Sequence, residues 1–305
     1  MPKKVSVLLP FLCLLLLSGC SGQPRQKDEK PVITVTIEPL RYFTEAIAGE
    51  HFRVISMVPK GNSPETYDPT PMQLMELTHS KAYFRVGYIG FERSWIDKLA
   101  DNAPHLQFFN LSDGVELIFD GGHAHPSDSE SALYYDATAP DRPVEGVEPH
   151  IWNSTENAQT ISANILRALC TIDKSHRDEY ITRYNKLSEQ IEQTDSLIKA
   201  RLSAPDADRA FMIYHPALSY FARDYGLKQI AIEEGGKEPS PAHLRALIDS
   251  CHAEKVRVVF VQPEFDKRNA ELITRQTGTH IVDINPLDYD WKGQMLKVAG
   301  ALSGH

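Results

Sequence analysis

The sequence has no surplus of basic residues, few cysteines and no apolar run long enough to cross a membrane comfortably. Its 305 residues include 32 lysines and arginines against 41 aspartates and glutamates, which gives a formal net charge of −9. A nucleic-acid-binding protein needs basic residues to neutralise phosphates, so we expect no nucleic-acid partner. The content of 42% hydrophobic and 24% charged residues is typical of a soluble globular chain, and the length favours two lobes over one core.

The N-terminal residues have the pattern of an export signal. A basic start precedes an apolar run over residues 5–17, and the sequence Leu-Ser-Gly-Cys20 follows. This ending resembles the lipobox of bacterial lipoproteins, in which the cysteine is lipidated and becomes the mature N-terminus. We therefore expect residues 1–19 to be a lipoprotein signal peptide and residues 20–30 a lipidated, polar tether. An ordinary signal peptide with an incidental cysteine is the alternative.

Two further cysteines, Cys170 and Cys251, belong to the mature chain. Export would make a disulfide between them possible. The sequence leaves open whether that disulfide forms.

Beyond residue 30, short β-rich runs alternate with amphipathic stretches. Strands are expected at 32–37, 53–58, 82–86 and 106–110, and again at 210–214, 228–232, 257–261 and 280–284. Helices are expected at 41–48, 71–79 and 91–103, and again at 216–224, 241–254, 267–277 and 291–302. Such an alternation predicts an α/β fold with parallel sheets.

Between the two halves the pattern changes. Residues 121–147 form a polar stretch without periodicity, and two helices are predicted at 154–172 and 175–202. The second helix would span roughly 40 Å, about the size of a domain. We therefore expect an N-terminal lobe over residues 31–153, connecting helices over 154–203 and a C-terminal lobe over 204–305, with a ligand cleft between the lobes.

The most informative segment surrounds His215. The apolar strand predicted before it ends at this histidine, Pro216 suits the first turn of the next helix, and Gly226 suits its end. Open α/β sheets bind their ligands at the carboxyl ends of strands, and neutral imidazole is a common metal ligand.

Three other polar residues follow strands or flank the expected cleft. Glu65 lies in a turn-rich loop, His150 lies in a short Glu-Pro-His segment, and Asn285 follows the last predicted strand. Each signal is weak alone. Together with His215 they predict a metal site in the cleft.

At these residues the chain resembles the metal-binding solute-binding lipoproteins of bacterial ABC importers, from the cluster A-I proteins that serve zinc and manganese. Five motifs carry the resemblance, and their order and spacing fit the whole mature chain. They are Gly-x-Ser-Pro-x-x-Tyr-x-Pro-x-Pro at 61–71, Glu-Pro-His-Ile-Trp at 148–152, Tyr-His-x-Ala-x-x-Tyr-Phe-Ala-Arg-x-Tyr-Gly-Leu at 214–227, Gly-Lys-Glu-Pro-Ser-Pro-x-x-Leu at 236–244 and Val-Phe-Val-Gln-Pro-Glu-Phe at 259–265. The resemblance implies two (βα)4-type lobes joined by one long rigid helix, with a metal ion between them.

The resemblance also implies a ligand set. The second and third ligands of the family fall on His150 and His215, and a histidine at the third position resembles the zinc-selective members. The first ligand, usually histidine, is Glu65 here, and the acidic fourth position is Asn285. Carboxylate binds zinc at a bond length similar to that of imidazole, so Glu65 is expected to supply the negative charge.

The fourth ligand remains open. Asn285 or a water molecule is the first choice, and Glu264 is the next. Asp283 shares the strand face of Asn285 but lies roughly 7 Å further back, too far for an easy exchange. His123 and His125 lie where many zinc members have a histidine-rich loop, and they are candidates for weak metal binding or for an ordinary loop.

The expected function is capture of Zn²⁺ as a transported ligand rather than catalysis. The resemblance implies delivery to an ABC permease and its ATPase subunit by a monomer that is lipid-anchored on the periplasmic or cell-surface side of a bacterial membrane. A receptor for manganese, iron or a broader set of divalent metals is one alternative, and an adhesin or storage lipoprotein is another. A zinc hydrolase with Glu65 as general base is less favoured, because the sequence contains no His-Glu-x-x-His motif.

Overall fold

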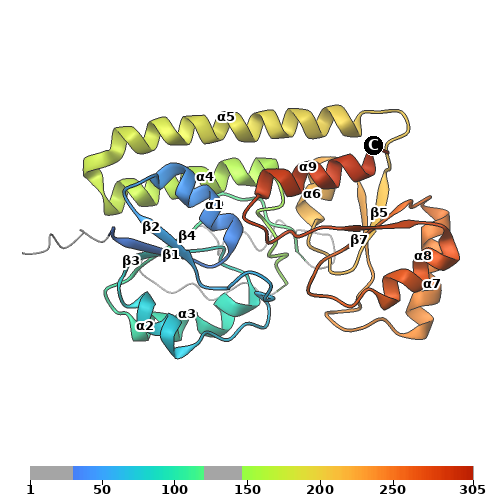
Figure 1. Ribbon diagram of the computed structural model, residues 1–305, viewed down its shortest axis with the longest axis horizontal. Helices are drawn as coiled ribbons and strands as arrows, with labels where there is room; N and C mark the ends of the chain where they lie inside the picture. The colour runs from blue at the N-terminus through green and yellow to red at the C-terminus, as the bar shows by residue number, and fades with distance from the viewer. Residues whose placement is uncertain (1–29, 120–145, 305) are drawn as a thin grey trace, which may run out of the picture. The chain divides into compact units, whose positions relative to one another are not determined.

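Two parallel four-stranded sheets, one in each half of the chain, form the framework of the protein (Figure 1). The computed structural model describes residues 30–119 and 146–304. Both sheets have the same strand order, β2-β1-β3-β4 in the first and β6-β5-β7-β8 in the second, with parallel neighbours. The strands are β1 (Val32–Val35), β2 (Arg53–Ser56), β3 (Ser80–Arg85), β4 (Gln107–Asn110), β5 (Ala210–Ile213), β6 (Lys228–Ala231), β7 (Val258–Val261) and β8 (His280–Asp283). This repetition confirms the predicted pair of similar lobes.

Helices cover these sheets and follow the predicted alternation. The first lobe contains α1 (Glu38–Ala48), α2 (Pro71–Leu77), α3 (Gly90–Asn102) and α4 (Thr155–Ile172), and the second contains α6 (Ser219–Asp224), α7 (Pro241–Ala253), α8 (Arg268–Thr277) and α9 (Trp291–Leu302). Local sequence explains several helix starts. The Ser154 and Ser240 hydroxyls each accept a hydrogen bond from the backbone N–H of the third residue of α4 and α7, and Thr70 and Gln73 form a capping box at α2.

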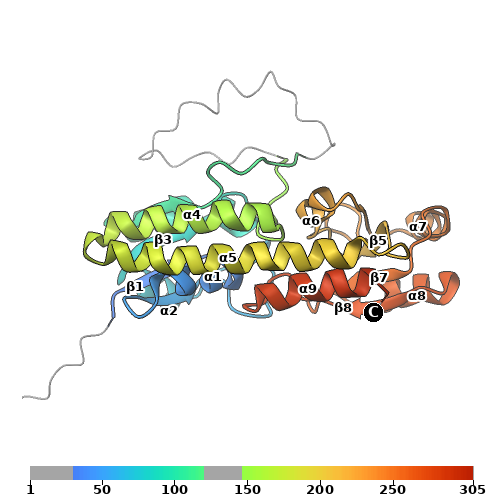
Figure 2. The ribbon, with the colours of Figure 1, turned by 90° about the horizontal axis from the view of Figure 1, so that it is seen from above.

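The long helix α5 (Arg177–Leu202) joins the two lobes. It follows a short 3₁₀ helix (Lys174–His176), and its 26 residues span about 39 Å at 1.5 Å per residue. It packs on α1 and α4 of the first lobe and on α9 of the second, as Figures 1 and 2 show. The predicted long connecting helix is therefore confirmed.

The lobes also share one apolar core. A single cluster of buried side chains includes Phe43 of the first lobe, Ile191 of α5, and Phe221 and Trp291 of the second lobe. Because side chains alternate along a strand, the opposite face of the second sheet forms its own cluster, which includes Met212. A continuous core and a shared helix favour small movements between the lobes over wide opening.

The strand order sets the position of the site. In the second sheet the strand order is β6-β5-β7-β8. After β5 the chain turns to one side, toward β6, and after β7 it turns to the other side, toward β8, so the two connections diverge at the carboxyl ends of β5 and β7. Ligands of open α/β sheets bind at this kind of crevice. His215 follows β5, and Gln262 and Glu264 follow β7.

The helix after His215 begins later than predicted. We expected it to start at Pro216, but α6 starts at Ser219, and Ala217 N instead donates to His215 O at 2.7 Å in a tight turn. Leu218 N donates to the Gln229 side chain at 2.9 Å and so does not continue a helical ladder. This turn separates His215 from the helix.

Other predictions concern the disulfide and segments that lie partly outside the described residues. Cys170 and Cys251 are both free thiols, so they form no disulfide with each other. The predicted signal peptide with Cys20, the tether up to residue 29, and His123 and His125 lie outside the described residues. Across residues 30–119 and 146–304, no helix has the length and apolar character needed to cross a membrane.

Candidate metal centre

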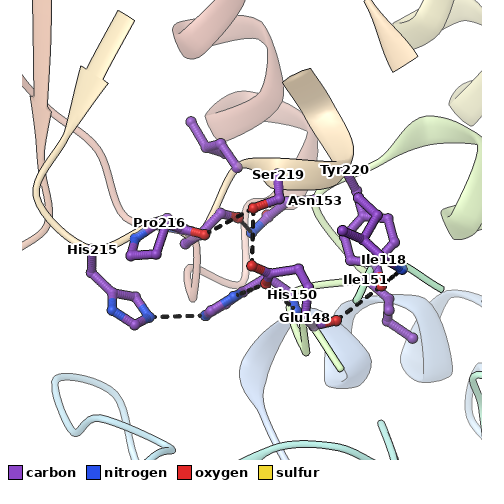
Figure 3. A network of polar contacts seen from close by, with 12 residues as sticks. Ile118, Glu148, His150, Ile151, Asn153, His215, Pro216, Ser219 and Tyr220 are labelled. Atoms are coloured by element: carbon purple, nitrogen blue, oxygen red, sulfur yellow. Dashed lines mark hydrogen bonds and ion pairs between the residues drawn. The ribbon is translucent and has the colours of Figure 1, made fainter. Parts of the chain in front are cut away.

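The imidazole rings of His150 and His215 point a nitrogen toward each other, with their planes inclined at 73° (Figure 3). Their Nε2 atoms are 3.2 Å apart, although the two residues are 65 positions apart in the sequence. Zinc bound tetrahedrally at 2.0–2.1 Å would hold two imidazole nitrogens about 3.3 Å apart. The separation of the two histidines therefore matches that of two ligands on one ion.

The carboxylate of Glu148 contacts the His150 ring at the nitrogen that points away from His215. His150 Nδ1 contacts Glu148 Oε1, and the backbone N–H of His150 donates to the same oxygen at 3.1 Å. A carboxylate accepts hydrogen bonds, so the ring carries its proton on Nδ1 and directs the Nε2 lone pair toward His215. Metal-binding histidines generally have such a partner at the nitrogen that does not bind the metal.

His215 has the same kind of support from other residues. Its Nδ1 lies 2.9 Å from Glu233 Oε1, and Phe265 stacks on its ring with centroids 5.5 Å apart. The buried Gln262 side chain holds the backbone of His215 on both sides, since it accepts from His215 N at 3.3 Å and donates to His215 O at 2.6 Å. Both rings thus present Nε2 lone pairs to one point, where a cation or a proton relieves their repulsion.

The pKa values of His150 and Glu148 both differ from their ordinary values. Burial opposes charge on His150, but the Glu148 carboxylate outweighs burial, with help from Glu65 and Glu233, and raises the pKa of His150 above its ordinary value. Burial likewise acts to raise the pKa of Glu148, yet the attraction of His150 lowers it overall. The site therefore attracts positive charge.

Glu65 adds a carboxylate from the first lobe. Its Oε2 accepts from Gly90 N at 3.0 Å, whereas its Oε1 is buried with no hydrogen-bond partner among the described residues. An unpartnered buried carboxylate oxygen is costly, and a cation satisfies it. A side chain at position 90 would come within 2.7 Å of Glu65 Oε2 and 2.6 Å of Glu65 O, so the close approach requires glycine.

A small cavity lies between these groups. It is lined by Ser63, Pro64, Glu65, His150, His215, Ala217, Gln262, Glu264, Phe265, Pro286 and Leu287. Its volume of about 30 Å³ suffices for an ion with a water molecule. Glu264 is the second carboxylate in the lining, and burial raises its pKa while His215 acts to lower it.

Two sequence candidates lie away from this lining. Asn285 Oδ1 accepts from Leu287 N at 3.1 Å and its Nδ2 donates to Asp288 at 3.4 Å, so its amide stabilises a turn. The Asp283 side chain is 64% exposed and pairs with Lys267 at 2.7 Å. Within the described residues, no group of three or more His, Cys, Asp or Glu side chains is gathered closely enough to hold a metal ion.

Sequence reasoning missed the supporting residues. Glu148 was visible in the Glu-Pro-His motif, two positions before His150, but had no assigned role. Glu233 follows β6 at the same end of the sheet as His215, and this placement was the only signal for it. Nothing in the sequence indicated that Gly90 supports Glu65.

The repeated parallel sheets, the shared long helix and the facing histidines define a two-lobed metal-binding protein of the substrate-binding class. The chain matches the family model described as "ZnuA: Zinc-uptake complex component A periplasmic" over residues 33–295, and it belongs to this family. The resemblance predicted from the sequence to solute-binding proteins of ABC metal importers is thereby confirmed.

Relatives in this family are named for different metals. The chain is 26% identical to "Iron ABC transporter substrate-binding lipoprotein MtsA" of Streptococcus pyogenes serotype M6 over 293 residues, which cover 92% of this chain and 88% of that protein. It is 27% identical to "Zinc-binding lipoprotein AdcA" of Streptococcus pneumoniae over 295 residues, which cover 94% of this chain and 56% of the relative. Similarity thus indicates metal binding without identifying the metal.

Solved structures agree with the fold. The "Crystal structure of ZnuA" matches with a TM-score of 0.79 and 30% identity, over 90% of this chain and 99% of the other. A manganese-bound periplasmic metal binding protein from Candidatus Liberibacter asiaticus matches with a TM-score of 0.73 over 90% of this chain. That protein is only 19% identical, so the likeness concerns the fold alone.

Proposed function

We propose that the protein is an extracytoplasmic receptor that captures Zn²⁺ between its lobes and delivers it to an ABC permease with its ATPase subunit. The observation that carries the proposal is the pair of Nε2 atoms 3.2 Å apart, each on a ring whose other nitrogen contacts a carboxylate. Two imidazoles with a carboxylate suit zinc. The small cavity supports binding of an ion over hydrolysis of an organic substrate.

In this proposal His150, His215 and Glu65 are the ligands. Glu264 or a water molecule completes the tetrahedron, because both have access to the cavity whereas the Asn285 amide is engaged in its turn. Lipidation at Cys20 would hold the monomeric receptor near its permease. His123 and His125 would assist capture as a second, weaker binding element.

Manganese or iron is the second candidate cargo. The observation that favours it is the presence of two carboxylates, Glu65 and Glu264, in the cavity lining. Oxygen-rich sites suit manganese better than sites dominated by imidazole. If both carboxylates bind the ion, the ratio of zinc affinity to manganese affinity should be smaller.

The test is a competition titration of the mature protein with Zn²⁺, Mn²⁺ and Fe²⁺ against a chelating indicator, with iron under anaerobic conditions. We expect one zinc ion per protein and zinc affinity at least a hundredfold above that for manganese. A deletion strain should also grow poorly at low zinc and recover when zinc is added. Tighter binding of manganese or iron would reassign the cargo, and no binding of any of the three would reject the proposal.

Zinc affinity is expected to fall as the pH falls. Zinc needs neutral imidazole, and the raised pKa of His150 means that protons begin to compete above pH 6.5, the ordinary value for histidine. Affinity should be constant well above that pKa and fall by up to about tenfold per pH unit for each competing proton below it. Titrations from pH 8 to pH 5, corrected for the indicator's own protonation, measure this curve. A flat curve would contradict binding through the two histidines.

Gly90→Ala is expected to weaken zinc binding about tenfold, the lower end of the range for groups that orient a ligand. The added Cβ would meet both Glu65 O and Glu65 Oε2 at less than 3 Å, so the ligand loop has to shift. Chelator competition measures the effect. Ser94→Ala, at an exposed position of the same helix, is the control and should change nothing. Unchanged affinity for Gly90→Ala would contradict the role of Glu65.

A further inference from the structure

The segment that bears His150 is attached to the second lobe. Trp152 Nε1 donates to Pro286 O at 2.8 Å, Trp291 Nε1 donates to Trp152 O at 2.7 Å, and Asn153 Nδ2 donates to Ala217 O at 2.8 Å. All three partners belong to the second lobe. The sequence position of His150, ahead of α4 and α5, gives no hint of this attachment.

Glu148 links His150 directly to the second lobe. One carboxylate oxygen contacts His150 Nδ1, and the other accepts from Ser219 Oγ, at the start of α6, at 2.9 Å (Figure 3). The backbone oxygen of Glu148 also accepts from Tyr220 OH at 2.9 Å. The carboxylate that orients His150 is therefore itself oriented by α6.

Ser219 has a defined direction of donation. Gln229 Nε2 on β6 donates to Ser219 Oγ at 2.9 Å, so the serine proton remains available for Glu148 at 2.9 Å rather than for the more distant Pro216 O at 3.3 Å. Gln229 and Glu233 lie on β6 and just after it. The same strand thus supports His215 directly through Glu233 and His150 indirectly through Gln229, Ser219 and Glu148.

Glu65 depends on different contacts. Its carboxylate is held by Gly90 N at the start of α3 in the first lobe. The backbone N–H of Glu148 also donates to Ile118 O of the first lobe at 2.8 Å, so the division concerns the side chains. The side-chain contacts divide the three candidate ligands into two groups, a pair of histidines held by the second lobe and a carboxylate held by the first.

We propose that Ser219 and Glu148 are positioning residues that fix His150 to the second lobe, so that the two histidines form a preassembled pair and Glu65 is the ligand contributed by the first lobe. This inference rests on the proposed function, because it deepens the description of the same site. A small movement between the lobes would therefore change the distance from Glu65 to the bound ion while the histidine pair stays together.

The test is a set of double-mutant cycles read as zinc affinity by chelator competition. Ser219→Ala should weaken zinc binding about fivefold. This is less than the effect expected for a residue that bonds a metal ligand directly, because Ser219 contacts His150 only through Glu148. The same fivefold loss should appear in a Glu65→Ala background, since Glu65 has separate support. In a His150→Ala background Ser219→Ala should have no further effect, because the group it positions is gone.

Ser219→Thr is the matched control, because it keeps the hydroxyl and should stay within about twofold of the wild type. Thermal unfolding of each metal-free variant identifies any that fail to fold. An equal loss in all three backgrounds would show a general structural effect and overturn the inference, as would no loss in the wild-type background. A wild-type protein that binds no zinc would instead reject the proposed function, so the two failures are distinct.

Discussion

His215→Ala is expected to reduce zinc affinity by at least two orders of magnitude. Structural zinc sites bind with about 10–16 kcal/mol over four ligands, so each ligand contributes about 3 kcal/mol, which is roughly a factor of 100 to 200. The loss should reach this size here because the only other imidazole among the lining residues is His150, which is itself a ligand in the proposed site. Water in the new space is a weaker ligand than imidazole.

Competition with a chelating dye measures this effect, and the residual affinity should also lose part of its pH dependence. His252→Ala is the matched control, because this exposed histidine of α7 lies in the same lobe and outside the cavity lining. It should bind zinc as the wild type does. Near wild-type affinity for His215→Ala would contradict the site, and an equal loss in both variants would indicate damage to the fold.

Glu148→Gln is the second large prediction, with an expected loss of 10- to 100-fold in zinc affinity, the range for outer partners of metal ligands. The carboxylate can accept hydrogen bonds from His150 Nδ1 and Ser219 Oγ together. An amide has only one oxygen. If its NH₂ group faces His150, the ring proton moves to Nε2, the atom that should bind zinc.

If the amide turns the other way, its NH₂ group faces Ser219 Oγ, which already accepts from Gln229. In that orientation the amide oxygen still accepts from His150 Nδ1, but Ser219 has to turn its proton to Pro216 O at 3.3 Å, and a neutral acceptor orients the ring less strongly than a carboxylate. Removal of the charge also removes the main cause of the raised pKa of His150, so the decline of affinity should move to lower pH while affinity at pH 8 is reduced. Glu271→Gln, on the exposed side of α8, is the control. Wild-type affinity at pH 8 for Glu148→Gln would contradict the positioning role.

Much of the architecture could be predicted because strands and helices follow from the local periodicity of apolar residues. The fully apolar sequences of β5 and β7 have buried side chains on both faces, as expected for central strands of parallel sheets. Apolar residues at helical spacing over residues 175–202 likewise predicted the long helix, which the structure has at Arg177–Leu202. The start of α6 was misjudged because Gln229, a residue from another strand, takes the N–H of Leu218.

The site was predictable only where its residues stand at strand ends. His215 follows β5 directly, so its place at the crevice follows from topology. The juxtaposition with His150 does not, since it depends on Glu148, Trp152 and Asn153 contacting the second lobe. Asn285 was a predicted ligand, yet its amide bonds within its own turn, a contact that the sequence leaves undetermined.

The sequence by itself determined the family, the α/β lobes and the long helix, because these depend on short-range pattern and on motifs in a fixed order. It also predicted the two histidines as candidate ligands. Only the tertiary structure decided that both rings point their Nε2 atoms at one point and that carboxylates from different segments hold them there. The physical reason is that a ligand's direction depends on hydrogen bonds to groups far away in the chain. Such contacts exist only after the lobes have folded against each other.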